Sequence, residues 1–237
     1  MGYRANSLGI RLLLWLEKFA YEHSEAVALT NAGAMRQVRE RFPGLPKVTI
    51  VSNGVDTRMF RPELRSDSLR KQLGASPDTF LVGYCGLHGV AQGLDVVNRA
   101  AKILRTLGKV KFVMIGEGPT RSELSEWARQ NDLENIVYQP LRPKAEMPVV
   151  LASLDVSLVP LAARLPGTMP SKIYEALASG AVPVVAKGCE GEALLNDHFA
   201  GETYEPGSAS ELAAAIERLA GDGARYAEMR ENAIRLS

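Results

Sequence analysis

Short apolar runs alternate with helix-like segments over most of the chain. The runs are rich in β-branched residues, as buried strands are, whereas the segments between them space apolar residues three and four apart. Strands are predicted at Phe80–Cys85, Val110–Ile115, Ile136–Tyr138, Val156–Val159 and Val182–Ala186. Helices are predicted at 93–107, 119–131, 144–152, 171–179, 208–221 and 224–236. Continuous apolar strands separated by helices indicate an α/β fold, a doubly wound parallel sheet of Rossmann-like type over residues 80–237.

The N-terminal part shows fewer elements. Helices are predicted at about 8–22 and 33–42, with short strands at Ala26–Leu29 and Val48–Val51. Because these elements bury too little apolar surface for an independent domain, residues 1–55 are expected to be the end of an N-terminal domain that starts before residue 1. Residues 56–79 are polar and turn-rich with one short helical piece, which predicts an interdomain connection.

The amino-acid composition limits which binding partners and cofactors can be expected. The 28 Lys and Arg residues balance 27 Asp and Glu residues, so no overall charge favours nucleic acid and any anion site must be local. The two cysteines, Cys85 and Cys189, and the three scattered histidines have no metal-ligand or disulfide spacing, so a metal-free, cofactor-free cytoplasmic protein is expected. Charges interrupt the apolar segment Leu8–Phe19, which predicts an amphipathic helix and not a membrane span.

The most informative stretch is the Gly/Pro loop and helix start at 165–175. A helix N-terminus offers free N–H groups and a positive dipole end to a phosphate, and a carboxylate one turn in suits a ribose diol. We therefore predict that Lys172 binds phosphate and Glu175 binds the ribose. The alternatives are an ion pair between the two side chains and a dipole-complementing role for Glu175. Ser171 is also a natural N-cap, a role that needs no ligand.

Glycine loops supply further candidates. Gly86 and Gly89 follow the first predicted strand and would let the backbone meet a pyrophosphate, with tight-turn packing as the alternative. His88 between them would face the sugar or the phosphates, unless it is simply solvated. In the next loop Gly116 and Gly118 lack the third glycine of a dinucleotide fingerprint, so we expect them to shape a turn, with a secondary role bordering the nucleoside.

Four stretches in order resemble a known family. They are residues 51–62 (N-G-V-D…F-x-P), 84–94 (the glycine loop), 112–119 (G-x-G-P) and 170–175 (P-S-K-I-x-E). Together they are similar to the C-terminal, nucleotide-sugar-binding domain of a family 4 retaining glycosyltransferase of GT-B fold, and in particular to the bacterial subgroup that transfers amino-sugar-type residues in surface-polysaccharide assembly. The resemblance extends from about Leu16 to the C-terminus.

The resemblance implies a function and further site residues. It implies transfer of a sugar, with retained configuration and without metal, from a nucleotide diphosphate donor to a glycan or lipid-linked acceptor held by the missing N-terminal domain. UDP is the preferred donor nucleotide. It places Lys172 and Glu175 at the catalytic centre, the backbones of Gly167, Thr168 and Met169 against the diphosphate and sugar, and Leu141 and Arg142 near the base, where Arg142 either stacks or is exposed.

Departures and alternatives remain. The family's Glu-x7-Glu pair has Gly167 at its first position here, so that carboxylate is absent. The usual Arg and Lys of the first glycine loop are also absent, with His88 and Gln92 nearby. The resemblance then implies that Lys172 is the residue that neutralises the diphosphate charge. Such enzymes act at the inner membrane face, and Leu12–Leu16 would either touch that surface or, as we favour, pack into the absent domain. The truncated chain is expected to be inactive alone. A nucleotide-binding module without turnover and a sugar-nucleotide epimerase of GT-B type stay open.

Overall fold

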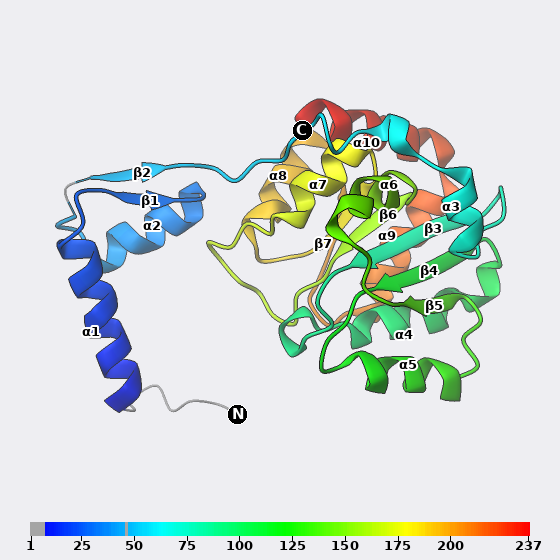
Figure 1. The fold of residues 1–237 in the computed structure, drawn as a ribbon, viewed down its shortest axis with the longest axis horizontal. Helices are drawn as coiled ribbons and strands as arrows, with labels where there is room; N and C mark the ends of the chain where they lie inside the picture. Colours follow the sequence, from blue (N-terminus) through cyan, green and yellow to red (C-terminus); the bar gives the residue numbers. More distant parts are fainter. Residues whose placement is uncertain (1–7, 46) are drawn as a thin grey trace. The chain divides into compact units, whose positions relative to one another are not determined.

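The computed structural model describes residues 8–45 and 47–237. It divides into two compact units (Figure 1). The first contains the residues up to Asn53 together with Pro166–Met169, and the second contains Gly54–Leu165 and Pro170–Ser237. The segment 56–79, predicted as a connection, is thus grouped with the second unit, and residues 1–7 of the predicted N-terminal fragment lie outside the described part.

The first unit contains two helices and a pair of short parallel strands. Its elements are α1 (Leu8–Glu22), β1 (Val27–Leu29), α2 (Ala32–Arg41) and β2 (Val48–Ile50), close to the predicted ranges. Asn31 begins α2, because its side chain accepts a hydrogen bond from the amide of Ala34 at 2.7 Å. No side chain of α1 is buried, and no helix in the described part of the chain is long and apolar enough to cross a membrane.

The second unit is built on a six-stranded parallel sheet with the strand order β5-β4-β3-β6-β7-β8. Its strands are β3 (Phe80–Cys85), β4 (Val110–Ile115), β5 (Ile136–Gln139), β6 (Val156–Val159), β7 (Val182–Ala186) and β8 (Glu202–Tyr204). The predicted bounds of β3, β4, β6 and β7 are confirmed, β5 is one residue longer, and β8 was not predicted. The predicted α/β class is therefore confirmed.

Helices cover both faces of this sheet (Figure 1). They are α3 (Asp67–Gln72), α4 (Asp95–Leu104), α5 (Arg121–Gln130), α6 (Met147–Ala152), α7 (Lys172–Ser179), α8 (Glu190–His198), α9 (Ala209–Gly221) and α10 (Gly223–Leu236). Because successive strand residues point to opposite faces, Val82 and Phe112 pack with α4, α5 and α9, whereas Leu81 and Val113 pack with α3 and α6. Of these helices, only α8 has no counterpart in the sequence-based prediction.

The sheet grows in two directions from its middle. From β3 the chain adds β4 and β5 on one side, then returns to add β6, β7 and β8 on the other. The loops that leave β3 and β6 therefore diverge at the carboxyl edge of the sheet, where open α/β sheets bind their ligands. The loop after β3 carries Gly86–Gly93, and the loop after β6 leads to α7.

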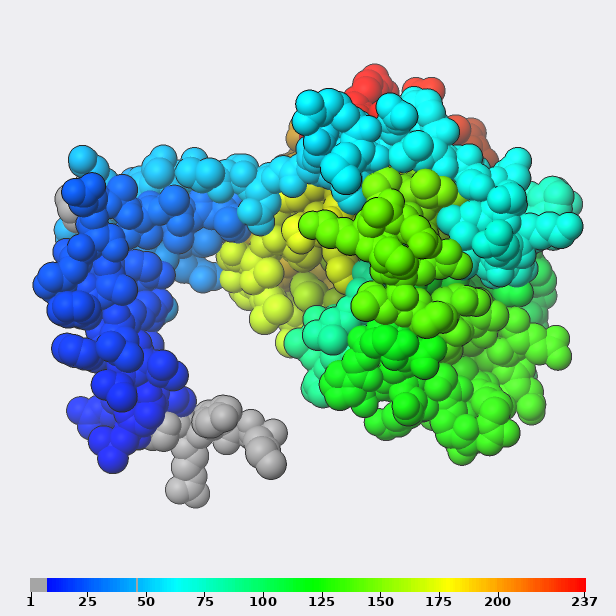
Figure 2. All heavy atoms as spheres, in the orientation of Figure 1, coloured from blue at the N-terminus to red at the C-terminus, as the bar shows by residue number. Residues whose placement is uncertain are grey.

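A buried ion cluster fastens the segment 54–79 to the second unit, over whose surface it runs in cyan in Figure 2. Asp155, just before β6, accepts hydrogen bonds from Arg70 and Arg65 at 3.0 Å each and from the amide of Leu81 at 2.7 Å. Arg70 is only 5% exposed and also donates to the carbonyl of Ser153 at 2.8 Å. This segment is consequently part of the folded unit.

Candidate functional site

Among the residues that the structure describes, the ammonium group of Lys172, at the start of α7, contacts only neutral groups. Its Nζ atom lies 4.4 Å from the centroid of the Tyr84 ring and 3.3 Å from the Tyr84 hydroxyl oxygen. The side chain is half-buried, and burial lowers the pKa of the ammonium, against the opposing influence of Cys85 and Glu175. Among the described residues no carboxylate forms an ion pair with it, so the predicted alternative of a Lys172–Glu175 pair is wrong.

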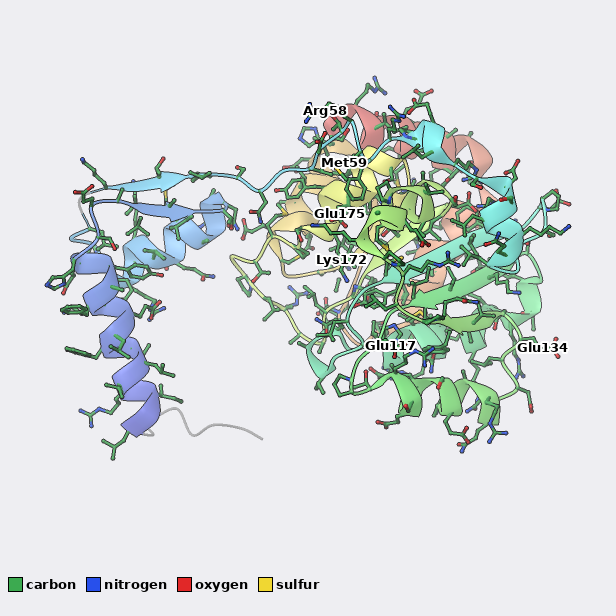
Figure 3. The ribbon with its side chains drawn as sticks, viewed as in Figure 1. Arg58, Met59, Glu117, Glu134, Lys172 and Glu175 are labelled. Carbon is green, nitrogen blue, oxygen red and sulfur yellow. The ribbon has the colours of Figure 1, made fainter. Side chains whose placement is uncertain are left out.

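Glu175 lies three residues further along the same helix (Figure 3). Its side chain is half-buried, and burial raises the pKa of the carboxyl group, while Lys172 and Lys144 act to lower it. The described residues supply no hydrogen bond to this carboxylate. Because a carboxylate accepts hydrogen bonds through two oxygens, Glu175 is available to a ligand that carries hydroxyl groups. The alternative role beside the helix dipole remains compatible with its position in the first turn.

The start of α7 is not capped by a side chain. Ser171 occupies the N-cap position with φ −61° and ψ −26°, and its hydroxyl makes no capping hydrogen bond. The predicted capping role of Ser171 is therefore wrong, because a capping residue typically has extended backbone angles and Ser171 has helical ones. In the first turn the amides of Ile173 and Tyr174 donate to the carbonyls of Pro170 and Ser171, at 3.1 Å each. The positive end of the helix dipole remains a feature that suits an anion.

Gly167, Thr168 and Met169 belong to the first unit. There the side-chain amide of Asn31 donates to the carbonyl of Gly167 at 3.0 Å. The predicted contacts of their backbones with the diphosphate and sugar stay a prediction.

Two glycine turns pack against each other beside Lys172. Gly86 has φ +150° and donates its amide to the carbonyl of Ile115 at 2.9 Å. Gly116 and Gly118 have φ +144° and +154°, and a Cβ atom on either would overlap the carbonyl oxygen of Gly86 or His88. Close backbone packing therefore requires glycine at Gly116 and Gly118, whereas at Gly86 it is the positive φ that favours glycine. Gly89, with φ −107°, has an ordinary backbone conformation.

The ring of His88 is completely buried, at 0% exposure. It lies between the rings of Tyr84 and Tyr138, with centroids 5.7 and 5.9 Å away, and neither ring nitrogen has a hydrogen-bond partner among the described residues. Burial lowers the pKa of the imidazole, and the nearby charge of Arg121 lowers it further. The predicted alternative of a solvated histidine is wrong, because the tight packing of the two glycine turns holds the ring inside.

Leu141 and Arg142 follow β5 at the same edge of the sheet. Leu141 is exposed, whereas Arg142 is half-buried and pairs with Glu146 at 3.1 Å. Arg142 also acts electrostatically on Cys85, as do Lys172 and Glu175, which places these groups around the end of β3. Burial nevertheless raises the pKa of the Cys85 thiol to about 12, so the thiol stays neutral. The fold thus gathers residues from three separate loops at one edge.

Sequence reasoning missed Tyr84, which contacts Lys172. Its strand position was predicted, but no pattern in the sequence indicates which residue will meet a helix 88 residues later. A cavity of about 830 Å³ in the second unit is lined by residues between Arg65 and Pro77 and not by Lys172 or Glu175. We therefore define the site by its unpaired charges. No group of three or more potential metal-ligating side chains gathers anywhere in the part of the chain that the structure describes.

The chain matches the family described as glycosyl transferases group 1 over residues 65–236. This match includes the whole sheet, both glycine turns and α7. The chain therefore belongs to this family, as the four ordered motifs predicted.

Two relatives from Escherichia coli extend this result. The chain is 31% identical to the colanic acid biosynthesis glycosyl transferase WcaI of strain K12, over 85% of this chain and 51% of that protein. It is 24% identical to a UDP-Gal:alpha-D-GlcNAc-diphosphoundecaprenol alpha-1,3-galactosyltransferase, over 88% of this chain and 54% of that protein. The chain thus spans about half the length of these relatives.

A solved structure confirms the fold. The crystal structure of Anabaena HepE in complex with UDP and glucose superposes with a TM-score of 0.81 and 21% identity, over 94% of this chain and 61% of that one. The predicted GT-B type of architecture is therefore confirmed.

Proposed function

We propose that the second unit binds the nucleoside diphosphate part of a UDP-sugar at the start of α7, as the donor half of a glycosyltransferase. The observation that carries this proposal concerns two charges on one helix face, the ammonium of Lys172 and the carboxylate of Glu175. Neither forms an ion pair with another described residue. Burial makes an unpaired charge costly, so a site of this kind is expected to bind complementary groups. UDP as the nucleotide is supported by the names of the galactosyltransferase relative and of the HepE complex.

Each group has a distinct role in this proposal. As the glycosidic bond to the donor breaks, negative charge grows on the departing diphosphate, and Lys172 stabilises it together with the positive end of the α7 dipole. Glu175 accepts hydrogen bonds from the ribose hydroxyls. The remaining contacts from the second unit are proposed to come from Gly86, His88, Gly89, Gly116, Gly118, Leu141, Arg142 and Ser171. Transfer retains the anomeric configuration and uses no cofactor beyond the donor.

The proposal also concerns the acceptor. We propose a glycan or lipid-linked acceptor, bound by a part of the protein that this chain does not span, since the relatives are about twice as long. Support comes from the galactosyltransferase relative, whose name specifies a diphosphoundecaprenol acceptor. The protein is proposed to work in the cytoplasm, at the inner face of the membrane.

Titration calorimetry with UDP and GDP tests the donor site. We expect saturable binding of UDP, weakened at least about tenfold, roughly 1.4 kcal/mol, by Glu175→Ala and by Lys172→Met. Glu228→Ala, at an exposed position on α10, is the matched control and should bind as the unaltered chain does. No saturable heat with either nucleotide, or unchanged affinity in folded Glu175→Ala and Lys172→Met variants, would refute the site.

Turnover needs a separate measurement. The full-length protein should release UDP from a UDP-sugar when an acceptor glycolipid is added. Binding of UDP without such release with any acceptor would favour a binding module and would refute the transferase part of the proposal.

A further inference from the structure

The hydroxyl of Tyr84 bridges two parts of the site. It donates a hydrogen bond to the carbonyl of Leu87 at 2.7 Å, which ties down the glycine loop after β3. Its oxygen also accepts a hydrogen bond from Nζ of Lys172 at 3.3 Å, and the ring lies beneath the same ammonium at 4.4 Å. The phenol has one proton and two lone pairs, so it can serve both partners at once.

The direction of the ammonium follows from these contacts. A Cβ atom built on Gly86 would overlap Nζ of Lys172 and would lie 3.3 Å from the Tyr84 hydroxyl. Lysine, loop and phenol therefore meet at Gly86. A lysine side chain is long and flexible, and holding its end in one place normally requires a partner such as a carboxylate.

The neutrality of the partner has a chemical consequence. A carboxylate in contact with Lys172 would hold the ammonium but would also neutralise it, and an incoming anion would have to compete. A phenol and its aromatic face attract a cation without removing its net charge. Tyr84 is 1% exposed, and burial raises the pKa of its hydroxyl, so it remains protonated and neutral at working pH.

We propose that Tyr84 is a positioning residue for donor binding, which holds the Lys172 ammonium and the Gly86–Leu87 turn together while leaving the charge of the lysine free for a diphosphate. This inference rests on the proposed function. It differs from a plain packing role because the contribution of the hydroxyl to donor affinity must pass through Lys172.

A double-mutant cycle isolates that difference. The affinity of UDP is measured by calorimetry for the unaltered chain, Tyr84→Phe, Lys172→Met and the double variant. Tyr84→Phe keeps the ring and removes only the hydroxyl, and we expect it to weaken UDP binding about tenfold. In the Lys172→Met background the same change is expected to have little further effect. Tyr226→Phe is the matched control, because that hydroxyl also donates to a backbone carbonyl, of Asp155 at 3.2 Å, but lies away from Lys172.

The outcomes separate the two proposals. Loss of UDP binding in Lys172→Met but not in Tyr84→Phe would overturn the positioning role and leave the donor site standing. An equal effect of Tyr84→Phe with and without Lys172 would also overturn it, since the hydroxyl would then act independently. No effect of Lys172→Met would contradict the proposed function itself.

A second measurement covers the case in which Tyr84→Phe does not fold. In the unaltered chain, NMR of the lysine ammonium groups reports whether the protons of Lys172 are hydrogen-bonded. Slow exchange of the Lys172 ammonium protons with water would support the positioning role. So would a change in their chemical shift when the ring of Tyr84 is fluorinated, or a scalar coupling across the hydrogen bond. A freely rotating, rapidly exchanging ammonium would overturn it.

Discussion

Substitution of Gly86 by alanine tests the geometry of the site most directly. Gly86 has φ +150°, a backbone conformation that residues with a side chain rarely adopt. The added methyl group would also overlap Nζ of Lys172 and lie 3.0 Å from its Cε atom. The end of the lysine can move aside, but the backbone conformation is held by the amide hydrogen bond from Gly86 to Ile115 at 2.9 Å. Gly86→Ala therefore has two separate consequences.

The size of each effect of Gly86→Ala can be estimated from its cause. Backbone strain is expected to lower the free energy of unfolding by about 1–3 kcal/mol. Displacement of the ammonium is expected to cost the charge-assisted contact with the donor, about 1.5–3 kcal/mol, which is about 10- to 150-fold in the dissociation constant of UDP. In a Lys172→Met background only the first effect should remain, because the second contact is already lost.

Urea unfolding and UDP calorimetry on the same samples measure the two effects. Gly221→Ala is the control, because a Cβ at that position in α9 meets no atom within 4 Å. It is expected to keep donor affinity and, as a helical Gly-to-Ala change, to match or exceed the parent in stability. A Gly86→Ala chain that is as stable as the parent and binds UDP as tightly would refute the reasoning about this turn.

Two further predictions concern stability. Asp155→Ala leaves the buried Arg70 without its carboxylate and should lower the free energy of unfolding by about 3–5 kcal/mol in urea titrations. The control Asp95→Ala breaks an exposed pair with Arg99 and should lower it by about 0.5 kcal/mol or less. Similar values for the two variants would contradict the buried-pair argument. For His88, burial lowers the imidazole pKa in the folded state, so below the unfolded value of about 6.5 the unfolded chain binds more protons and stability falls as pH falls. Urea titrations between about pH 7 and pH 5 should show this decrease in the parent and a flatter profile in His88→Phe, whereas identical slopes would argue against a buried neutral ring.

Local patterns predicted most of the elements but not all. The strands β3, β4, β6 and β7 were placed correctly because each is an uninterrupted apolar run flanked by polar or glycine residues. The three-residue strand β8 carries Glu202, a residue type that disfavours strands. Its carboxylate is paired with Arg218 at 2.8 Å and Arg225 at 2.9 Å, from helices later in the chain. These partners, and the pairing of β8 with β7, come from residues that are distant along the chain, so no local pattern indicates the strand.

The sequence by itself determined the class of fold, the order of its elements, the family, and the glycine turns and helix start at which a donor is proposed to bind. These features depend on residues that are neighbours along the chain. Among the described residues, the tertiary structure decided that Lys172 has no carboxylate partner, that the ring nitrogens of the buried His88 have no hydrogen bond, and that Tyr84 contacts the lysine. The reason is the strand order, which pairs β3 with β6 and so brings the residues after two distant strands to one edge of the sheet.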